Sequence, residues 1–142
     1  MKIKEISAGK TYLIRKNILR NGIDLPYKFK EDFDEDTFHL GAYDSDELVG
    51  IATFIKNKIN DFEGDQYQLR GMATSEKGRG KGFGKQIINE AKVILKQKNV
   101  SVLWCNARKE AVMFYKKLNF TIVGEEFNVV KVGLHYKMYT EI

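Results

Sequence analysis

The stretch that decides the fold is a glycine-rich hexapeptide, Arg79-Gly80-Lys81-Gly82-Phe83-Gly84. It stands between a strand-like run, residues 67–73, and a segment of helical periodicity that begins at residue 83. A glycine-rich turn that opens a helix directs several free backbone N–H groups to one place, and the helix dipole adds to their attraction for phosphate. Positive charge gathers at the same turn, on Lys77, Arg79, Lys81 and Lys85. The turn therefore predicts a ligand with several phosphate charges.

Two common phosphate-binding loops do not fit this turn. A Walker A loop requires G-x-x-x-x-G-K-[ST], but Arg79 replaces its first glycine and Gln86 its last residue. The dinucleotide fingerprint G-x-G-x-x-G also fails, because Phe83 or Lys85 stands where the third glycine is required. The pattern that fits is R-x-x-G-x-G, over residues 79–84. A glycine- and lysine-rich surface loop without a ligand is the alternative that the hexapeptide alone leaves open.

The pattern R-x-x-G-x-G is the coenzyme A pyrophosphate signature of the GNAT superfamily of N-acetyltransferases, which this chain resembles. A second segment extends the resemblance: residues 103–108, LWCNAR, and residues 111–120, AVMFYKKLNF, are similar to the family's strand-to-helix segment with its A-x-x-F-Y-x-x-x-G-F pattern. Asn119 stands where glycine is usual, a mild departure because Asn tolerates the left-handed conformation. Residues 39–42 and 135–139 are similar to a bacterial GNAT subgroup of unassigned substrate.

Composition limits the class of protein. The chain has 142 residues, enough to bury a core as one domain over residues 1–142, and its 43% hydrophobic and 12% aromatic content indicates a folded globule. No apolar run approaches the roughly 18 residues that span a bilayer, and no apolar signal region follows the first residues. A single cysteine, Cys105, excludes an internal disulfide framework and a multi-cysteine zinc site. These features favour a soluble cytoplasmic protein without a membrane partner.

The chain is basic, with a formal net charge of +5 and a pI of about 9.2. Such a charge attracts nucleic acid, but it also suits an anionic cofactor. The basic residues concentrate at the glycine turn and form no long run. We therefore expect a phosphate-bearing cofactor, and no nucleic acid, as the partner of this charge.

Residue periodicity predicts seven strands and three helices. The strands are expected at residues 2–6, 37–43, 48–55, 66–74, 100–105, 121–127 and 135–140. The helices are expected at residues 8–19, from residue 83 onward and at residues 108–118, with an ordered loop at residues 22–36. This order implies an α/β (α+β) protein with a mixed, mostly antiparallel sheet of about seven strands and helices on both faces. It is the order expected of the GNAT fold.

The resemblance implies transfer of an acetyl group from acetyl-CoA to a primary amine, on a small molecule or an amino-terminal group, by direct attack in a ternary complex. Such an enzyme must hold the coenzyme, stabilise the oxyanion and move two protons. The resemblance also implies that residues 72–74 line the pantetheine arm through backbone groups, with the Ala73 N–H at the thioester carbonyl. The expected cofactor-binding residues are Met72, Ala73, Thr74, Arg79, Gly80, Lys81, Gly82, Phe83, Gly84, Lys85 and Asn106.

Tyr115 and Asn106 are the catalytic candidates. The resemblance implies that Tyr115 protonates the departing thiolate; the alternative is a half-buried helix tyrosine beside Phe114. Asn106 ends a predicted buried strand, where ligands of parallel sheets gather, so its amide is expected to hold the pantetheine or a water molecule. Its alternative is the N-cap of the next helix. We interpret Cys105 as a buried core thiol and not as a nucleophile.

A general base is not evident. A lysine-like amine has a pKa of roughly 10.4 and must lose a proton, but residues 68–71, QLRG, carry no carboxylate where many family members have a glutamate. His39, His135 or a chain of water molecules is the substitute, and for each histidine a structural role is the simpler interpretation. Arg70 and Arg108 either bind a substrate carboxylate or form surface salt bridges. No cluster of His, Cys and carboxylates has metal-ligand spacing, so no metal is expected.

Three other functions remain open from the sequence. The same fold can transfer a longer acyl group, or it can act as a non-catalytic acyl-CoA sensor, which the missing carboxylate favours. A nucleic-acid-binding module would show affinity that falls steeply with salt. The resemblance is compatible with a homodimer. We expect residues 22–36 and the last strands to choose the acceptor.

Overall fold

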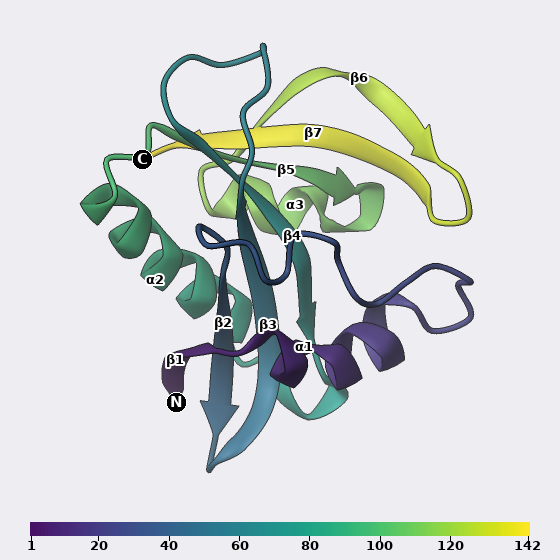
Figure 1. Cartoon of the computed structure of the whole chain (residues 1–142). Coiled ribbons are helices and arrows are strands. Elements are labelled where there is room, and N and C mark those ends of the chain that lie inside the picture. The colour runs from purple at the N-terminus through teal and green to yellow at the C-terminus, as the bar shows by residue number, and fades with distance from the viewer.

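Seven strands form one sheet in the computed structural model, which describes residues 1–142. The strands are β1 (Lys2–Ile6), β2 (Phe38–Asp44), β3 (Glu47–Lys56), β4 (Gln66–Thr74), β5 (Val102–Arg108), β6 (Thr121–Val129) and β7 (Gly133–Glu141). Their order is β1-β2-β3-β4-β5-β7-β6, and only β4 and β5 run parallel. Figure 1 shows β1 to β4 and β5 to β7 as two parts of the sheet that diverge. The predicted mixed, mostly antiparallel sheet is confirmed.

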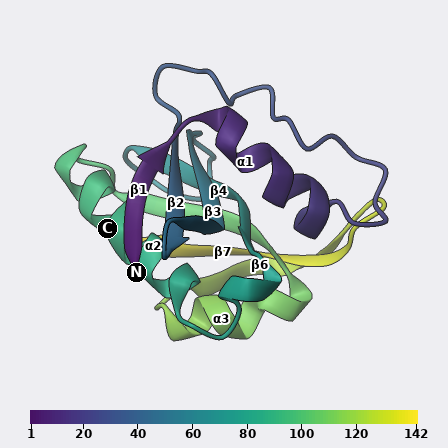
Figure 2. The same ribbon diagram turned by 90° about the horizontal axis from the view of Figure 1, so that it is seen from below.

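Helices cover both faces of this sheet (Figure 2). On one face, α1 (Ala8–Ile14) and the π-helical turn η1 (Arg15–Leu19) pack against β3 and β4. On the other, α2 (Phe83–Gln97) packs against β1 to β4, and α3 (Val112–Lys117) packs against β5. The larger part of the core lies under α2 and α3, and a smaller part lies under α1. No helix combines the length and the apolar character that crossing a membrane requires.

The second helix illustrates how the sequence directs this packing. Phe83, Ile87, Ala91 and Leu95 recur at helical spacing and are all buried, so α2 presents one apolar face to the sheet. The left-handed φ of +69° at Asn119, just after α3, agrees with the expectation from the resemblance. The helix predicted at residues 8–19 is present, although its second half is π-helical.

Two predicted boundaries were wrong. The strand expected at residues 100–105 is β5, Val102–Arg108, and it extends further because it pairs with β7 along its full length, up to Arg108 opposite His135. The helix expected at residues 108–118 therefore starts later. A 3-10 turn, η3 (Lys109–Ala111), precedes α3. Periodicity alone misses this, because the strand is prolonged by a partner that lies far along the chain.

Candidate active site

The parallel strands β4 and β5 separate halfway along their length. Their pairing runs from Gln66 opposite Val102 to Leu69 opposite Cys105 and stops there, although both strands continue. Beyond that point the facing strand edges have no partner in the sheet. Unpaired backbone groups at such an edge can form hydrogen bonds with an extended ligand, in the way that they would pair with a neighbouring strand. The opening contains the three residues, 72–74, that were expected to meet the pantetheine arm.

A bulge in β4 shapes this opening. Between the pairs Ile51–Ala73 and Thr53–Arg70, β4 contributes one residue more than β3. Gly71 takes a φ of +61°, and a Cβ there would lie 2.9 Å from the Phe29 ring, so only glycine fits. A bulge bends its strand and leaves a residue outside the regular ladder. The irregular backbone is adjacent to Met72 and Ala73.

The glycine turn follows β4 and the short 3-10 turn η2 (Glu76–Gly78). Gly80 and Gly82 have φ of +74° and +81°, and a Cβ at either would meet nothing within 4 Å. Gly82 is the N-cap of α2, and no side chain caps this helix. An open glycine surface thus leads to uncapped N–H groups at a helix N-terminus, the arrangement that binds phosphate.

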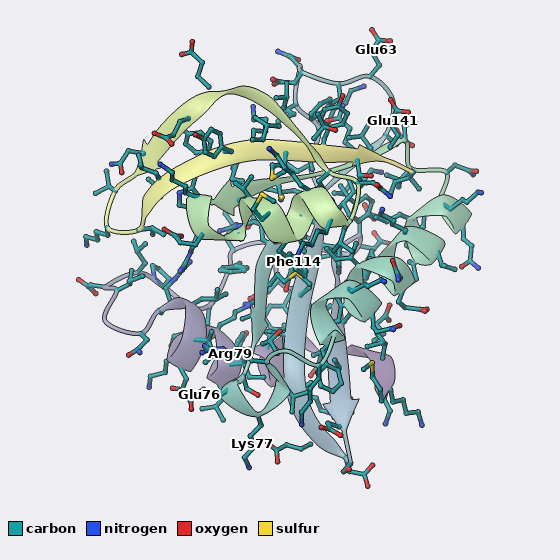
Figure 3. All side chains as sticks on the ribbon, turned by 180° about the vertical axis from the view of Figure 1, so that it is seen from behind. Glu63, Glu76, Lys77, Arg79, Phe114 and Glu141 are labelled. Carbon is teal, nitrogen blue, oxygen red and sulfur yellow. The ribbon has the colours of Figure 1, made fainter.

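Gly84 has a packing role beside the coenzyme contact expected of it, and that contact stays a prediction. A Cβ at Gly84 would lie 2.9 Å from the Phe114 ring and 3.7 Å from Cε of Met72. Figure 3 places Phe114 between α3 and the start of α2. Glycine is therefore required at this position by the close packing of α2 against α3.

The positive charges of the turn are not equivalent. Lys77 and Lys81 each lie 3.3 Å from a carboxylate of the β2–β3 hairpin, Glu47 and Asp44 respectively. Both pairs are exposed to solvent and contribute little to stability. Arg79 and Lys85 take part in no ion pair. Their charge is available to an anion at the turn.

A cavity of about 600 Å³ lies at the other end of the opening. Its lining comes from β4, β5, the end of η1, the turn before α3 and α3 itself, the loop at residues 22–36 and the β6–β7 hairpin. Of the predicted catalytic and cofactor-binding residues, three border it together, Met72, Asn106 and Tyr115, whereas no residue of the turn at 79–84 does. The candidate base His135 and the candidate carboxylate-binding residues Arg70 and Arg108 border it as well. Met72 bridges the two regions, because its Cε adjoins Gly84 and its Sδ lies 3.7 Å from the Tyr115 hydroxyl.

Tyr115 is buried, with 7% of its surface exposed. Its ring packs edge-on against Phe114 and obliquely against Phe120. The hydroxyl has only the Met72 sulfur as a protein partner, a weak acceptor. Burial, with a smaller contribution from Cys105, raises the pKa of Tyr115 well above its ordinary value. The phenol therefore keeps its proton at neutral pH and can donate it to a ligand in the cavity.

The two residues at the end of β5 behave differently. Cys105 is 2% exposed, and burial raises the pKa of its thiol to about 12. A thiol that stays protonated is a poor nucleophile, so the interpretation as a core cysteine is confirmed. Asn106 is exposed, faces Lys137 in the ladder and borders the cavity. The N-cap alternative for Asn106 was wrong, because Arg108 is the N-cap of η3.

A buried polar cluster holds the loop at residues 22–36 against β3. Arg15 is fully buried and donates two hydrogen bonds to Asp32, at 2.8 and 2.9 Å, and one to Thr53 Oγ1, at 2.7 Å. Its guanidinium also stacks 3.8 Å from the centroid of the Phe29 ring. This cluster was missed from the sequence, because nothing local connects residues 15, 32 and 53.

His39 belongs to this cluster and not to the cavity. Its Nε2 donates to the Asp32 carbonyl at 3.1 Å, and its Nδ1 accepts from Thr53 Oγ1 at 2.8 Å. Burial lowers the pKa of His39, against the opposing effect of Asp32, so the ring is neutral. With both nitrogens engaged and no access to the cavity, His39 has the structural role, and the structure removes it as a base.

Two proton acceptors do border the cavity, His135 and Glu31. His135 Nδ1 lies 2.8 Å from the Gly133 carbonyl and must donate to it, which leaves Nε2 of the neutral ring as an acceptor. Glu31 lies 3.4 Å from Arg70, on the strand where a carboxylate was sought. Glu31 was overlooked because the loop delivers it from a distant part of the sequence; the acidic run at residues 31–36 was the only signal.

Comparison with known proteins identifies the class. Residues 21–140 match the family described as the acetyltransferase (GNAT) domain. The uncharacterized N-acetyltransferase YitI of Bacillus subtilis is 38% identical over 141 residues, which cover 98% of this chain and 95% of that protein. The chain belongs to the GNAT acetyltransferase family, whose members use acetyl-CoA.

Solved structures of low sequence identity share the fold. An aminoglycoside 6'-N-acetyltransferase complexed with coenzyme A superposes with a TM-score of 0.79 at 14% identity, covering 99% of this chain and 97% of that one. Escherichia coli ElaA superposes with a TM-score of 0.79 at 17% identity, covering 97% of both chains.

Proposed function

We propose that residues 1–142 form one cytoplasmic acetyltransferase domain that moves an acetyl group from acetyl-CoA to a primary amine, of a small molecule or an amino-terminal group. Transfer is by direct attack in a ternary complex and needs no metal. The observation that carries this proposal is the opening between β4 and β5. It lies between the open, uncapped glycine turn at residues 79–84 and a cavity in which a buried phenol, Tyr115, lacks a strong hydrogen-bond partner.

The turn and the strand before it supply the coenzyme site. The open backbone at Gly80 and Gly82, with the uncapped N–H groups at Phe83, receives the pyrophosphate. Arg79, Lys81 and Lys85 neutralise its charge, and Gly84 allows α2 to pack beside the site. Met72, Ala73 and Thr74 hold the pantetheine arm along the free edge of β4, and the Asn106 amide approaches it from β5. The Ala73 N–H stabilises the oxyanion as the amine attacks.

Tyr115 is the general acid in this proposal. The thiolate of coenzyme A leaves as the tetrahedral intermediate collapses, and a phenol with a raised pKa still holds the proton that the sulfur requires. The ring is fixed by Phe114 and Phe120, so the hydroxyl is held in place before the substrate arrives.

Glu31 or His135 removes the amine proton, directly or through water. The variants Glu31→Gln and His135→Gln separate the two, because loss of the base removes the ascending limb of the pH–rate profile. If both variants keep that limb, water acts alone.

Thiol release tests the function. The protein is incubated with acetyl-CoA, or with a longer acyl-CoA, and a panel of primary amines, and the products are identified by mass. Acetylated amine formed together with free coenzyme A supports the proposal. Tight acyl-CoA binding with no turnover on any amine would contradict it and would indicate the sensor function.

A further inference from the structure

The cavity at the acceptor side of the opening is strongly basic. Five cationic side chains line it and only one carboxylate, that of Glu31; the cations are Arg20, Lys28, Lys30, Arg70 and Arg108. Like charges around one small cavity repel one another, which costs stability unless a ligand compensates. Because no residue of the glycine turn borders this cavity, these charges are separate from the expected pyrophosphate site.

Two of the arginines are fixed but have no anionic partner. Arg20 Nε donates to the Pro26 carbonyl at 2.9 Å, and Arg108 Nη2 donates to the Leu19 carbonyl at 3.0 Å. Neither arginine takes part in an ion pair. Backbone carbonyls thus orient both guanidinium groups and leave their remaining N–H donors free.

The positive charges of these arginines are close enough to repel one another. Burial, followed by repulsion from Arg108 and Arg70, lowers the pKa of Arg20. Arg70 differs from the other two, because Glu31 lies 3.4 Å from it and its guanidinium stacks 4.2 Å from the Phe29 ring centroid. Lys28 and Lys30 also take part in no ion pair, but no hydrogen bond orients their ammonium groups. The charge that is both uncompensated and oriented therefore lies at Arg20 and Arg108, between the end of η1 and the end of β5.

We infer that the acceptor is a primary amine that also carries a small oxyanion, a carboxylate or a phosphate, bound by Arg20 and Arg108. The inference rests on the proposed acetyl transfer and names its substrate class. A guanidinium presents paired donors that match such an oxyanion, so two oriented arginines can hold it bidentately. With the oxyanion there, the amine of a short molecule lies within the same cavity as Tyr115 and Glu31.

Three matched acceptors test the inference on the wild-type protein: alanine, alaninamide and 1-aminoethylphosphonate. They differ only in the group beside the amine, and rates are expressed per neutral amine to remove the difference in amine pKa. Binding of each to the protein saturated with coenzyme A is measured by calorimetry, in parallel with thiol release. We expect kcat/KM for one or both anionic acceptors to exceed that for the amide by at least about tenfold, the lower end of what a hydrogen bond to a charged group contributes.

Variants then locate the oxyanion. Arg20→Gln and Arg108→Gln are each expected to raise KM for the preferred anionic acceptor at least about tenfold. KM for the amide is expected to stay within about twofold of the wild-type value. Lys10→Gln removes one exposed positive charge from α1, outside the cavity, and controls for net charge. If Arg108→Gln unfolds the protein, because its carbonyl contact is lost, Arg20→Gln and the wild-type comparison still decide the result.

The two proposals fail in different ways. Equal kcat/KM values for the amide and for both anionic acceptors would overturn the oxyanion site and leave acetyl transfer intact. The same conclusion would follow if the arginine variants changed kcat/KM for all three acceptors by the same factor. Anion-selective binding without thiol release would support the site and overturn the transfer. A preference for alanine identifies the oxyanion as a carboxylate, and one for the phosphonate identifies it as a phosphate.

Discussion

Replacing Gly82 by aspartate places a side chain and a negative charge where the coenzyme pyrophosphate is expected. A Cβ at this position meets nothing within 4 Å in the free protein, so the fold accommodates it. Two unit charges about 5 Å apart interact by about 0.8 kcal/mol in water. A pyrophosphate with two charges therefore loses at least about 1.4 kcal/mol, which is a tenfold loss of acetyl-CoA affinity.

Backbone strain is the competing explanation, and the chain offers a matched control. Gly124 in β6 has the same φ of +81° and also has nothing within 4 Å of its Cβ position. Gly124→Asp carries the same added charge and a similar cost of about 1 kcal/mol for the left-handed conformation. Calorimetric titration should show weakened binding for Gly82→Asp alone, while both variants melt at similar temperatures. Unchanged affinity in Gly82→Asp would refute the assignment of the phosphate turn.

Three further predictions concern charge. Arg79→Gln with Lys85→Gln should raise KM for acetyl-CoA, and added salt should narrow the difference from wild type, because exposed charges are screened; a loss of oligonucleotide binding with no change in KM would contradict this. Asp32→Asn should lower the free energy of unfolding by about 3–5 kcal/mol, because it leaves the charge of Arg15 buried without its partner. Glu31→Gln breaks a half-exposed ion pair with Arg70 and should change the free energy of unfolding by less than about 1 kcal/mol. Because the folded-state pKa of His39 is lowered, stability should be full above about pH 6.5 and fall as pH drops below it. Chemical denaturation across this range should show the loss, and His39→Gln should lack it.

Acid stability has a second component at lower pH. Burial raises the pKa of Asp32, but hydrogen bonds from Arg15 and the Phe29 N–H outweigh burial, so the pKa is lowered overall. The stability that Asp32 contributes is therefore present above about pH 3.9 and is lost as the pH falls toward the folded-state pKa. The loss of stability that depends on His39 and the loss that depends on Asp32 can be distinguished because they occur in different pH ranges.

The sequence predicted the features that depend on short-range patterns. The turn at residues 79–84 opens α2 as its glycine spacing indicated, and β4 has the predicted bounds, Gln66–Thr74. Asn119 takes the left-handed conformation expected where the family usually has glycine. Each of these features is set by residues within one turn or one strand.

Features that depend on distant contacts were not predictable in the same way. The cavity joins residues from β4, β5, the loop at 22–36 and the β6–β7 hairpin. The loop was expected to choose the acceptor, but the sequence did not indicate that Glu31 and Arg20 lie beside Tyr115 in one cavity. The role of Gly84 depends on Phe114, which lies thirty residues further along the chain. The extension of β5 depends on β7. In each case the feature depends on a contact between residues that are far apart in the sequence and that only the folded chain brings together.

The most direct test of the proposed chemistry is the turnover of Tyr115→Phe with an active amine, with chemistry shown to be rate-limiting. The substitution keeps the ring packed between Phe114 and Phe120 and removes a hydroxyl whose only protein partner is a sulfur at 3.7 Å. General acid–base groups contribute about 10²–10⁴-fold, so we expect turnover to fall at least tens of fold. Acetyl-CoA affinity and melting temperature should stay unchanged. Turnover within about twofold of wild type would show that Tyr115 is not the acid, and a large loss of stability instead would show that its hydroxyl is structural.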